Sequence, residues 1–369
     1  MLPRVRVVHV VQNLNYGGME KLLADLVRRI DHGRFESHVV TLEYLGRFSR
    51  EMEGSAELHL CPPMSRASML RPAGLARCLT AIRPDVVHTH SGVWYKASRA
   101  GRMAGARAVV HTEHGKQAGD WLSRVLDRRA ARRTTAVVAV SRALGQYLSG
   151  RLQMPLEAIH VIPNGVDATR FMPRPPSGTL RDQLGLRPEQ AIIGSIGRLE
   201  PVKGYDVVIR AFAALPRRAD EVQPVLVIAG EGSARAELEH LAASLGISDR
   251  VFLLGWRDDP EDLLAHFRCF VLGSWSEGTS VSLLEAMASG VAPAVTAVGG
   301  NPAVLGEELS AQAVVPGDPN ALSLAVARLL DADVASGVGA TARRRVQTVY
   351  GLDAMVGAYE TLYRTVLGL

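Results

Sequence analysis

Strand-like and helical segments alternate along this chain of 369 residues in two successive series. Short apolar runs are each followed by a longer amphipathic stretch, which predicts parallel strands joined by helices that cover both faces of a sheet. We expect the strands of the first series at residues 7–11, 37–42, 85–88, 108–112, 136–140 and 159–162. We expect those of the second series at residues 192–197, 225–230, 251–254, 269–272, 291–295 and 313–315. The alternation therefore constrains the chain to an α/β fold with doubly wound parallel sheets.

Turn-forming residues mark the boundary between the two series. Residues 163–167 read Pro-Asn-Gly-Val-Asp, and residues 170–178 are rich in proline, so neither stretch favours regular structure. Because the chain is also longer than one typical core, we expect two Rossmann-like domains that face each other across a cleft. Ligands of such sheets bind at the carboxyl ends of the strands. A last helical pattern covers residues 353–366, but its periodicity does not indicate which domain it joins.

The formal net charge of +5 is unevenly distributed. Residues 1–165 hold 24 Lys and Arg against 13 Asp and Glu, a net of +11, whereas residues 166–349 hold 17 against 22, a net of −5. Residues 350–369 hold one basic and two acidic residues, which closes the sum at +5. A basic first half favours an anionic partner, either a phosphate-bearing substrate or an acidic membrane face. Solvated surface arginines would give the same count.

The composition argues against several classes of protein. Cys61, Cys78 and Cys269 are scattered and form neither a metal-binding spacing nor a disulfide framework, which fits a reducing cytoplasm. The first residues enter a strand-like run directly, so we expect no cleavable leader. No apolar run reaches the roughly 20 residues needed to cross a bilayer. We therefore expect a cytoplasmic globular enzyme, with contact at the inner face of an anionic membrane as a further expectation.

Residues 276–290, SEGTSVSLLEAMASG, carry two acids in a suggestive context. Glu277 lies in a glycine-containing turn after an apolar run, and Glu285 follows eight residues later within a helical pattern. A strand, a glycine turn and a helix aim backbone N–H groups at an anion. The two carboxylates would then grip the two ends of a sugar nucleotide. Alternatively, Glu277 is a solvated turn acid, and Ser282 with Glu285 forms an ordinary capping box.

A glycine-containing loop follows the first expected strand of each of the two series. Residues 197–204 place Arg198 and Lys203 five residues apart, where a guanidinium fork and a compact ammonium would neutralise a leaving diphosphate without a metal. Two ordinary surface cations are the alternative. In the first series, Gly17 and Gly18 permit close approach of the backbone to a ligand. Their spacing differs from the G-x-G-x-x-G fingerprint, so a dinucleotide site is disfavoured.

Histidines and arginines supply further candidates in the first half. Two neighbouring strand ends carry His88, His90, His111 and His114, which together favour a functional role in hydrogen bonding to a sugar. No helical histidine pair or cysteine partner indicates zinc. Residues 121–133 predict a helix with five arginines, which is typical of a membrane-surface helix or of a solvated face.

An Asp-x-Asp pattern at Asp331 and Asp333 is a further candidate, because some transferases hold a divalent cation with it. It follows a helical segment and precedes Gly337, which we take as a helix-end position. We therefore interpret it as a solvated helix terminus rather than a cation site.

These motifs occur together in one order along the chain. They are Gly17-Gly18, the turn at residues 163–167, G-R-x-x-x-x-K-G at residues 197–204 and E-G-x-x-x-x-x-x-E at residues 277–285. The chain thus resembles the retaining glycosyltransferases of family 4, also described as glycosyl transferases group 1, which have the GT-B fold. The resemblance covers nearly the whole chain, and the acidic pair with the Arg/Lys pair is its most specific part.

The resemblance implies a role for each matching residue of the second half. Arg198 and Lys203 would bind the diphosphate of the donor, and Glu285 would accept hydrogen bonds from the ribose hydroxyls. Glu277 would face the donor sugar, and Trp256 would lie against the base. The remaining donor-binding positions that it implies are Gly17, Gly18, Gly278, Thr279, Ser280 and Val281. Many members carry bulkier residues or glycine in place of Thr279 and Ser280, which leaves the donor sugar open.

The resemblance also assigns parts of the first half. His114 matches the position of the family's catalytic histidine, with His111 as the alternative. Members of the family end with a helix that crosses back to the first domain. We therefore expect a first domain of residues 1–168 with 350–369, on the acceptor side, and a donor domain of residues 169–349.

The expected activity is transfer of a hexose from a nucleotide diphosphate sugar, UDP- or GDP-linked, to a glycan or lipid-linked acceptor. The resemblance places this reaction in exopolysaccharide, lipopolysaccharide or glycolipid synthesis, with retention of configuration at the anomeric carbon. It implies no metal or other cofactor, and we expect no nucleic-acid partner. A nucleotide-sugar epimerase of the same fold and a nucleotide-binding paralogue without activity are the alternatives.

Overall fold

The computed structural model describes residues 4–15, 17–61, 71–116, 119–216 and 222–369. The chain divides into two compact units, Met1–Gly165 with Leu352–Leu369, and Val166–Gly351. Val166 belongs to the second unit because it is buried in that unit's core, donates its N–H to the carbonyl of Tyr350 at 2.9 Å and pairs with Gly351. The division therefore falls a few residues from the expected positions after residue 168 and before residue 350.

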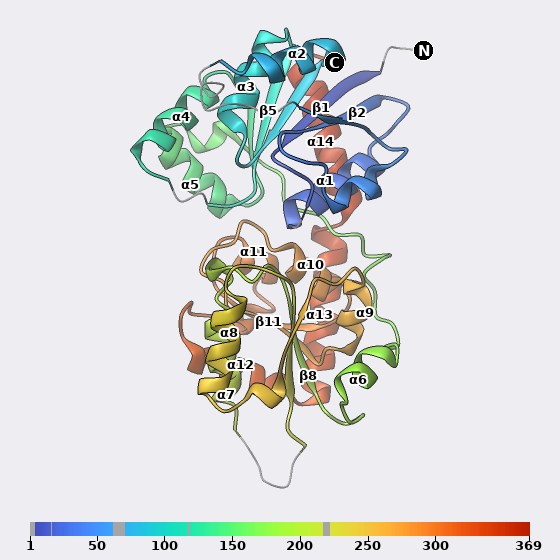
Figure 1. Cartoon of the computed structure of the whole chain (residues 1–369), viewed down its shortest axis with the longest axis vertical. Helices are drawn as coiled ribbons and strands as arrows, with labels where there is room; N and C mark the ends of the chain where they lie inside the picture. The colour runs from blue at the N-terminus through green and yellow to red at the C-terminus, as the bar shows by residue number, and fades with distance from the viewer. Residues whose placement is uncertain (1–3, 16, 62–70, 117–118, 217–221) are drawn as a thin grey trace. The chain divides into compact units, whose positions relative to one another are not determined.

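The first unit is built on a seven-stranded parallel sheet among its described residues, in the order β3-β2-β1-β4-β5-β6-β7 (Figure 1). Its strands are β1 (Val5–Val11), β2 (Phe35–Thr41), β3 (Glu57–Leu60), β4 (Val86–His90), β5 (Ala108–Glu113), β6 (Ala136–Ala139) and β7 (Ile159–Val161). Its helices are α1 (Gly18–Arg29), α2 (Ala73–Ile82), α3 (Trp94–Met103), α4 (Trp121–Ala131), α5 (Arg142–Leu152) and α14 (Leu352–Leu367).

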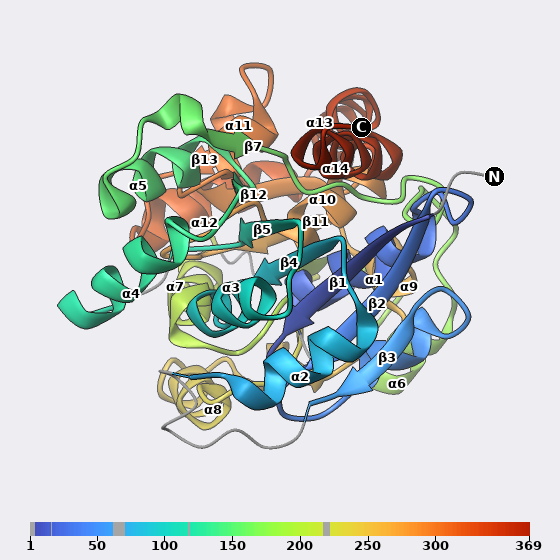
Figure 2. The same ribbon diagram turned by 90° about the horizontal axis from the view of Figure 1, so that it is seen from above.

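Helices cover both faces of this sheet, as the apolar strands require. Side chains of α2 and α3 pack on one face against Val8, Val10 and Val40, and Figure 2 shows these two helices in front of the strands. On the other face, α14 packs through Tyr363, whose ring meets Phe35 edge to face at 6.0 Å. The last helix of the chain thus contributes to the core of the first unit.

Strand β3 was not predicted from the sequence. Its four residues alternate charged or polar with apolar side chains, and none of them is buried. A strand at the edge of a sheet needs no continuous apolar run. It pairs with a neighbour along one edge only, and its side chains remain partly exposed to solvent. The apolar-run criterion therefore overlooked it.

The second unit contains a six-stranded parallel sheet among its described residues, in the order β10-β9-β8-β11-β12-β13. Its strands are β8 (Ile192–Ile196), β9 (Val225–Ala229), β10 (Val251–Gly255), β11 (Cys269–Leu272), β12 (Ala292–Thr296) and β13 (Ala313–Val314). Its helices are α6 (Thr179–Leu184), α7 (Tyr205–Ala213), α8 (Arg235–Ser244), α9 (Pro260–His266), α10 (Val281–Ala288), α11 (Asn301–Leu305), α12 (Pro319–Leu329) and α13 (Ala332–Val349). The predicted pair of doubly wound α/β units is confirmed.

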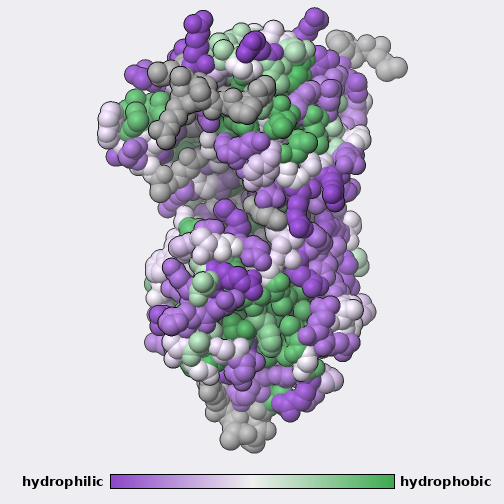
Figure 3. Space-filling model, in the orientation of Figure 1, coloured by the Kyte–Doolittle hydropathy of each residue, from purple (hydrophilic) through white to green (hydrophobic). Residues whose placement is uncertain are grey.

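Two hydrophobic clusters fill the faces of the second sheet. Phe270 and Leu272 point into one of them, and Cys269 and Val271 point into the other, as alternation along a strand requires. The edge strand β10 is only partly covered, and Figure 3 shows hydrophobic side chains between the positions of α8 and α9. The core is thus built from strands that are apolar on both sides.

One local prediction needs correction. Gly337 lies inside α13 and is not a helix end. Asp331 is instead the N-cap of α13, where its carboxylate accepts hydrogen bonds from the N–H groups of Asp333 and Val334. The interpretation of this pair as a helix terminus fits the cap, since a capping carboxylate is engaged with backbone donors. No helix in the described part of the chain is long and apolar enough to cross a membrane.

Candidate functional site

The second sheet reverses its strand order between β8 and β11. From β8 the chain proceeds outward to β9 and β10, and it then crosses to β11, β12 and β13 on the other side. The helices that follow β8 and β11, α7 and α10, therefore pack in different hydrophobic clusters, and the carboxyl ends of the strands at such a reversal are the usual ligand site of these sheets. The loop after β8 carries Arg198 and Lys203, and the loop after β11 carries Glu277.

Lys203 and Glu277 meet at this point. The Nζ atom of Lys203 lies 2.7 Å from Oε1 of Glu277, and the hydroxyl of Ser274 donates to the same oxygen at 2.7 Å. Glu277 is buried, and the side chain of Lys203 is 18% exposed. The sequence predicted both residues as ligands of one donor. The structure brings them together and adds that they pair directly.

Glycines allow the two loops to approach this closely. Gly204 has φ +59°, and a Cβ there would lie 2.0 Å from the carbonyl oxygen of Gly273. The N–H of Trp275 donates to the carbonyl of Val202 at 2.9 Å and fastens one loop to the other. Gly299 has φ +55°, and a Cβ there would lie 1.8 Å from the carbonyl oxygen of Glu277. Only glycine fits such a backbone conformation and such a contact without strain.

Helix α10 begins beside Glu277 and carries the remaining predicted residues of this motif. Its N-cap is Ser280, whose hydroxyl accepts from the N–H of Leu283 at 3.3 Å. The alternative capping box of Ser282 with Glu285 is therefore wrong, because Ser282 lies inside the first turn. Glu285 is buried four residues after the first helical residue, Val281. Gly278 and Thr279 lie in the buried turn before the cap.

Neighbouring loops bring two further predicted residues to the same edge of the sheet. Arg198 is exposed at the start of its loop, so its guanidinium is accessible to a ligand. Trp256 follows β10, and its indole N–H donates to Asp258 at 2.7 Å. The ends of β9 and β10 are joined by a bond of 2.8 Å from the N–H of Gly230 to the carbonyl of Gly255. The predicted donor-binding residues of this unit thus follow β8, β10 and β11.

The first sheet has its own reversal, between β1 and β4. Gly17 and Gly18 follow β1, with Gly17 as the N-cap of α1 and Gly18 exposed as its first residue. A Cβ at Gly17 would lie 2.3 Å from a carboxylate oxygen of Glu20. An added Cβ would therefore require only the carboxylate end of Glu20 to shift. Tyr16, in the same loop, lies outside the described residues.

His114 follows β5, and its backbone is held in place by its neighbours. Its N–H donates to the hydroxyl of Ser91 at 3.0 Å and to Oε1 of Glu113 at 3.1 Å. Ser91 in turn donates to the same carboxylate oxygen. Burial raises the pKa of Glu113, but hydrogen bonds and charge from His111, with the bond from Ser91, outweigh it and lower the pKa. This buried carboxylate therefore stays charged and anchors the loop.

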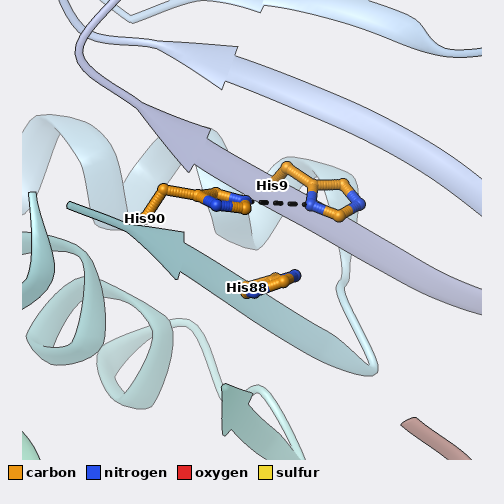
Figure 4. Close-up of side chains that lie close together, drawn as sticks. All are labelled: His9, His88 and His90. Atoms are coloured by element: carbon orange, nitrogen blue, oxygen red, sulfur yellow. Dashed lines mark hydrogen bonds between the residues drawn. The ribbon is translucent and has the colours of Figure 1, made fainter. Parts of the chain in front are cut away.

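A chain of imidazoles runs from His114 into the core. Nε2 of His114 lies 3.1 Å from Nδ1 of His90, whose Nε2 lies 3.3 Å from Nδ1 of His9 (Figure 4). Burial lowers the pKa of His9 to about 3 and that of His114 to about 4, and it holds the pKa of His90 well below 6.5. All three rings are therefore neutral near pH 7, so each donates through one nitrogen and accepts through the other.

Two atoms at the ends of this chain have no hydrogen-bond partner within the described residues, Nδ1 of His114 and Nε2 of His9. His9 was not found from the sequence, because it lies within the apolar strand β1 and resembles an ordinary core position. Its pairing with His88 in the register of β1 and β4 is the structural signal that was missing.

His111, the alternative catalytic histidine, has a different environment. Its ring is fully buried and stacks on Trp94, with centroids 3.9 Å apart and planes 5° apart. Its Nδ1 lies 2.9 Å from the hydroxyl of Thr89. These contacts are typical of a histidine that holds two strands and a helix together.

Comparison with known proteins shows the family to which the chain belongs. The family described as Glycosyl transferases group 1 matches residues 177–345, and Glycosyltransferase Family 4 matches residues 16–170. N-acetyl-alpha-D-glucosaminyl L-malate synthase of Bacillus anthracis is 30% identical over 291 residues, which cover 77% of this chain and 75% of that protein. The chain is a family 4 glycosyltransferase.

Two further proteins resemble this glycosyltransferase over nearly its whole length. The UDP-Gal:alpha-D-GlcNAc-diphosphoundecaprenol alpha-1,3-galactosyltransferase of Escherichia coli is 25% identical and covers 98% of this chain and 97% of its own. The structure of Anabaena HepE in complex with UDP and glucose matches with a TM-score of 0.84 at 20% identity, covering 98% of this chain and 100% of that chain. The fold of this glycosyltransferase is therefore GT-B, as predicted.

Proposed function

We propose that this glycosyltransferase moves a hexose from a UDP- or GDP-sugar to a glycan or lipid-linked acceptor, with retention at the anomeric carbon. Its product would belong to an exopolysaccharide, a lipopolysaccharide or a glycolipid. The observation that carries the proposal is the Lys203–Glu277 pair at the reversal of the second sheet, 2.7 Å apart. The name of the Escherichia coli relative, which includes a UDP-sugar and a diphosphoundecaprenol acceptor, supports the proposed substrate classes.

The charges near this pair suit the departure of a diphosphate. As the glycosidic C–O bond breaks, positive charge grows on the sugar ring and negative charge grows on the leaving phosphate. Arg198, Lys203 and the N-terminus of α10 would stabilise that negative charge. Backbone N–H groups at and before the start of α10 would lie near the distal phosphate, namely those of Gly278, Thr279, Ser280 and Val281. Glu277 would bind hydroxyls of the sugar. The acceptor would attack from the face that the diphosphate leaves.

Binding of the nucleoside and of the reacting sugar involves the other predicted residues. Glu285 would accept hydrogen bonds from the ribose, and Trp256 would lie against the base. In the first unit, Gly17 and Gly18 would approach the donor through their backbone. His114 would use Nδ1, which has no partner among the described residues, to hydrogen-bond the transferred sugar, since the other ring nitrogen is engaged with His90.

A direct test measures release of the nucleotide from a panel of UDP- and GDP-sugars, with a lipid-linked acceptor present. We expect Lys203→Ala to lower turnover about 10²-fold or more. Arg210→Ala, an exposed cation of α7 in the same unit, is the matched control and should keep turnover. Equal turnover in both variants would remove the proposed role of Lys203. Conversion of the donor without acceptor would favour an epimerase, and an inverted product by NMR would contradict retention.

Transfer by these residues would need no metal, because Arg198 and Lys203 supply the positive charge. We expect turnover to be unchanged after treatment with a chelator. Loss of activity with recovery on adding Mg²⁺ or Mn²⁺ would contradict this part of the proposal.

We also propose that α4 contacts the cytoplasmic face of an anionic membrane. This helix exposes Trp121 and Leu122, at 68% and 47%, next to the exposed Arg124 and Arg129. Apolar side chains beside cations are typical of interfacial helices. We expect sedimentation with anionic liposomes at low salt, weakened in the double variant Arg124→Gln, Arg129→Gln.

The matched control for this experiment is the double variant Arg71→Gln, Arg77→Gln, which removes the same charge from exposed positions of the first unit. Equal binding of both double variants, or no salt-sensitive binding at all, would contradict membrane contact by α4.

A further inference from the structure

A second group of histidines lies at the edge of the first sheet and includes no residue proposed for transfer. His38 comes from β2, and Glu57 and His59 come from the edge strand β3. His38 is the direct neighbour of Glu57 in the register of the two strands. Since residues two apart in a strand share a face, all three side chains project to the same side of the sheet.

The nitrogen and oxygen atoms of these side chains surround one point. Nδ1 of His38 lies 3.1 Å from Nε2 of His59 and 3.4 Å from Oε2 of Glu57. Nε2 of His59 lies 3.8 Å from Oε1 of Glu57. In a tetrahedral zinc site with bonds of about 2.0–2.1 Å, ligand atoms are about 3.3 Å apart. The three groups are therefore already spaced close to the distances that such an ion requires.

Glu36 fixes which nitrogen of His38 faces this point. The carboxylate of Glu36 accepts from Nε2 of His38 at 2.9 Å and is itself held by Nε of Arg6 at 3.0 Å. With its proton on Nε2, a neutral His38 presents the lone pair of Nδ1 toward Glu57 and His59. A ligand histidine that donates its other N–H to a carboxylate is the usual outer-shell arrangement of metal sites.

We propose that His38, Glu57 and His59 bind one divalent transition-metal ion, with zinc as the ion whose ligand preferences they match. Two imidazoles and one carboxylate form a common three-ligand zinc set that leaves a fourth position for water. The side chain of Glu57 is 69% exposed, so the ion reaches the site from solvent. Bound there, it fastens the edge strand β3 to β2, and it plays no part in glycosyl transfer.

Among the described residues, a further group of histidines with suitable spacing, His9, His88 and His90, fits a metal less well. Both ring nitrogens of His88 are already engaged, Nδ1 with the hydroxyl of Tyr363 at 2.7 Å and Nε2 with that of Thr112 at 2.8 Å. Binding an ion through His88 would therefore break a buried hydrogen bond to a hydroxyl, whereas the atoms beside Nδ1 of His38 belong to His59 and Glu57, which are proposed ligands themselves. The sequence did not reveal the site on β2 and β3, because its ligands lie on two strands and form no local motif.

The test uses the full-length chain without an affinity tag, stripped with a chelator and titrated with Zn²⁺ and, separately, with Co²⁺. We expect one equivalent of Co²⁺ to give the intense visible absorption of a tetrahedral site. Zn²⁺ at about 100-fold above its Kd should raise Tm by about 5 °C or more. The variant His59→Ala should lose both responses. His160→Ala, an exposed histidine of β7 in the same unit, should keep them.

A second variant, Glu57→Ala, removes an exposed ligand and protects the test against misfolding of His59→Ala. It should weaken binding of Co²⁺ at least 10-fold. The proposal is overturned if the wild-type chain shows no stoichiometric binding. It is also overturned if His59→Ala and Glu57→Ala bind as tightly as His160→Ala, because the ion would then occupy other histidines.

Discussion

Lys203 and Glu277 lie 74 residues apart in the chain, yet Nζ of one is 2.7 Å from Oε1 of the other. Both charges are largely removed from water. Each compensates the other, since an unpaired charge in such a position would be costly. A diphosphate at this point would exchange one partner of Lys203 for another and would leave Glu277 beside the sugar that it is proposed to bind.

Breaking this pair should destabilise the second unit. We expect Lys203→Met to lower the free energy of unfolding by about 2–4 kcal/mol, because it leaves the buried carboxylate of Glu277 without its cation. The double variant Lys203→Met, Glu277→Gln should lose less than the sum of the two single variants. Urea denaturation of all four proteins measures the coupling. Strictly additive losses would show that the two side chains do not interact in solution.

Gly299 should be sensitive to a single methyl group. Gly299→Ala would place a Cβ 1.8 Å from the carbonyl oxygen of Glu277, so the loop of Glu277 must move. We expect a loss of about 1–3 kcal/mol beyond the cost of positive φ, together with at least about 10-fold lower turnover. Gly246→Ala is the control, since Gly246 has φ +65° but no atom within 4 Å of the added Cβ. Equal effects of the two substitutions would disprove the contact.

His90 should act as a positioning residue for His114. We expect His114→Ala to lower kcat about 10²-fold or more. His90→Ala should lower kcat about 10-fold with little change in KM for the donor, because it frees the ring of His114 to rotate. His90→Gln, which keeps both a donor and an acceptor, should restore part of the loss. If His90→Ala changed only Tm and left kcat intact, the contact with His114 would be purely structural.

Stability of the first unit should fall as the pH is lowered below neutrality. Burial lowers the pKa of His9 from 6.5 to about 3 and that of His114 to about 4, so between those values and 6.5 the unfolded chain binds more protons than the folded chain. Stability therefore rises with pH across this window, by up to about 1.4 kcal/mol per pH unit for each group. Urea midpoints at pH 7, 6 and 5 measure the slope. His9→Asn should flatten it, and an unchanged slope would contradict the assignment.

The sequence predicted the parts of the fold that depend on local pattern. Apolar runs located the central strands, and the turn chemistry near Gly165 located the region where the units divide. Strand β3 was missed because an edge strand can alternate polar and apolar residues. The cap of α10 was missed, because the capping-box pattern pointed to Ser282 whereas the N-cap is Ser280. The turn before this cap lies against Gly299 of a distant loop, a contact that no local pattern contains.

The candidate site was predicted as residue types and not as contacts. Lys203 and Glu277 were found from their motifs, but their pairing follows from the strand order β8–β11, which no local pattern contains. His9 was missed because a buried histidine in an apolar strand looks like a core residue. The roles that the resemblance assigned to these side chains remain predictions.

Binding of a nucleoside diphosphate tests the proposed donor site most directly. Isothermal titration with UDP and with GDP would compare the wild-type chain, Arg198→Ala and Arg210→Ala. Both arginines are exposed, but only Arg198 lies in the loop at the carboxyl end of β8, whereas Arg210 lies in α7. We predict stoichiometric binding of one nucleotide, weakened about 10- to 100-fold by Arg198→Ala and unchanged by Arg210→Ala. No binding of either nucleotide, or equal affinity in the two variants, would contradict a donor site at this reversal of the sheet.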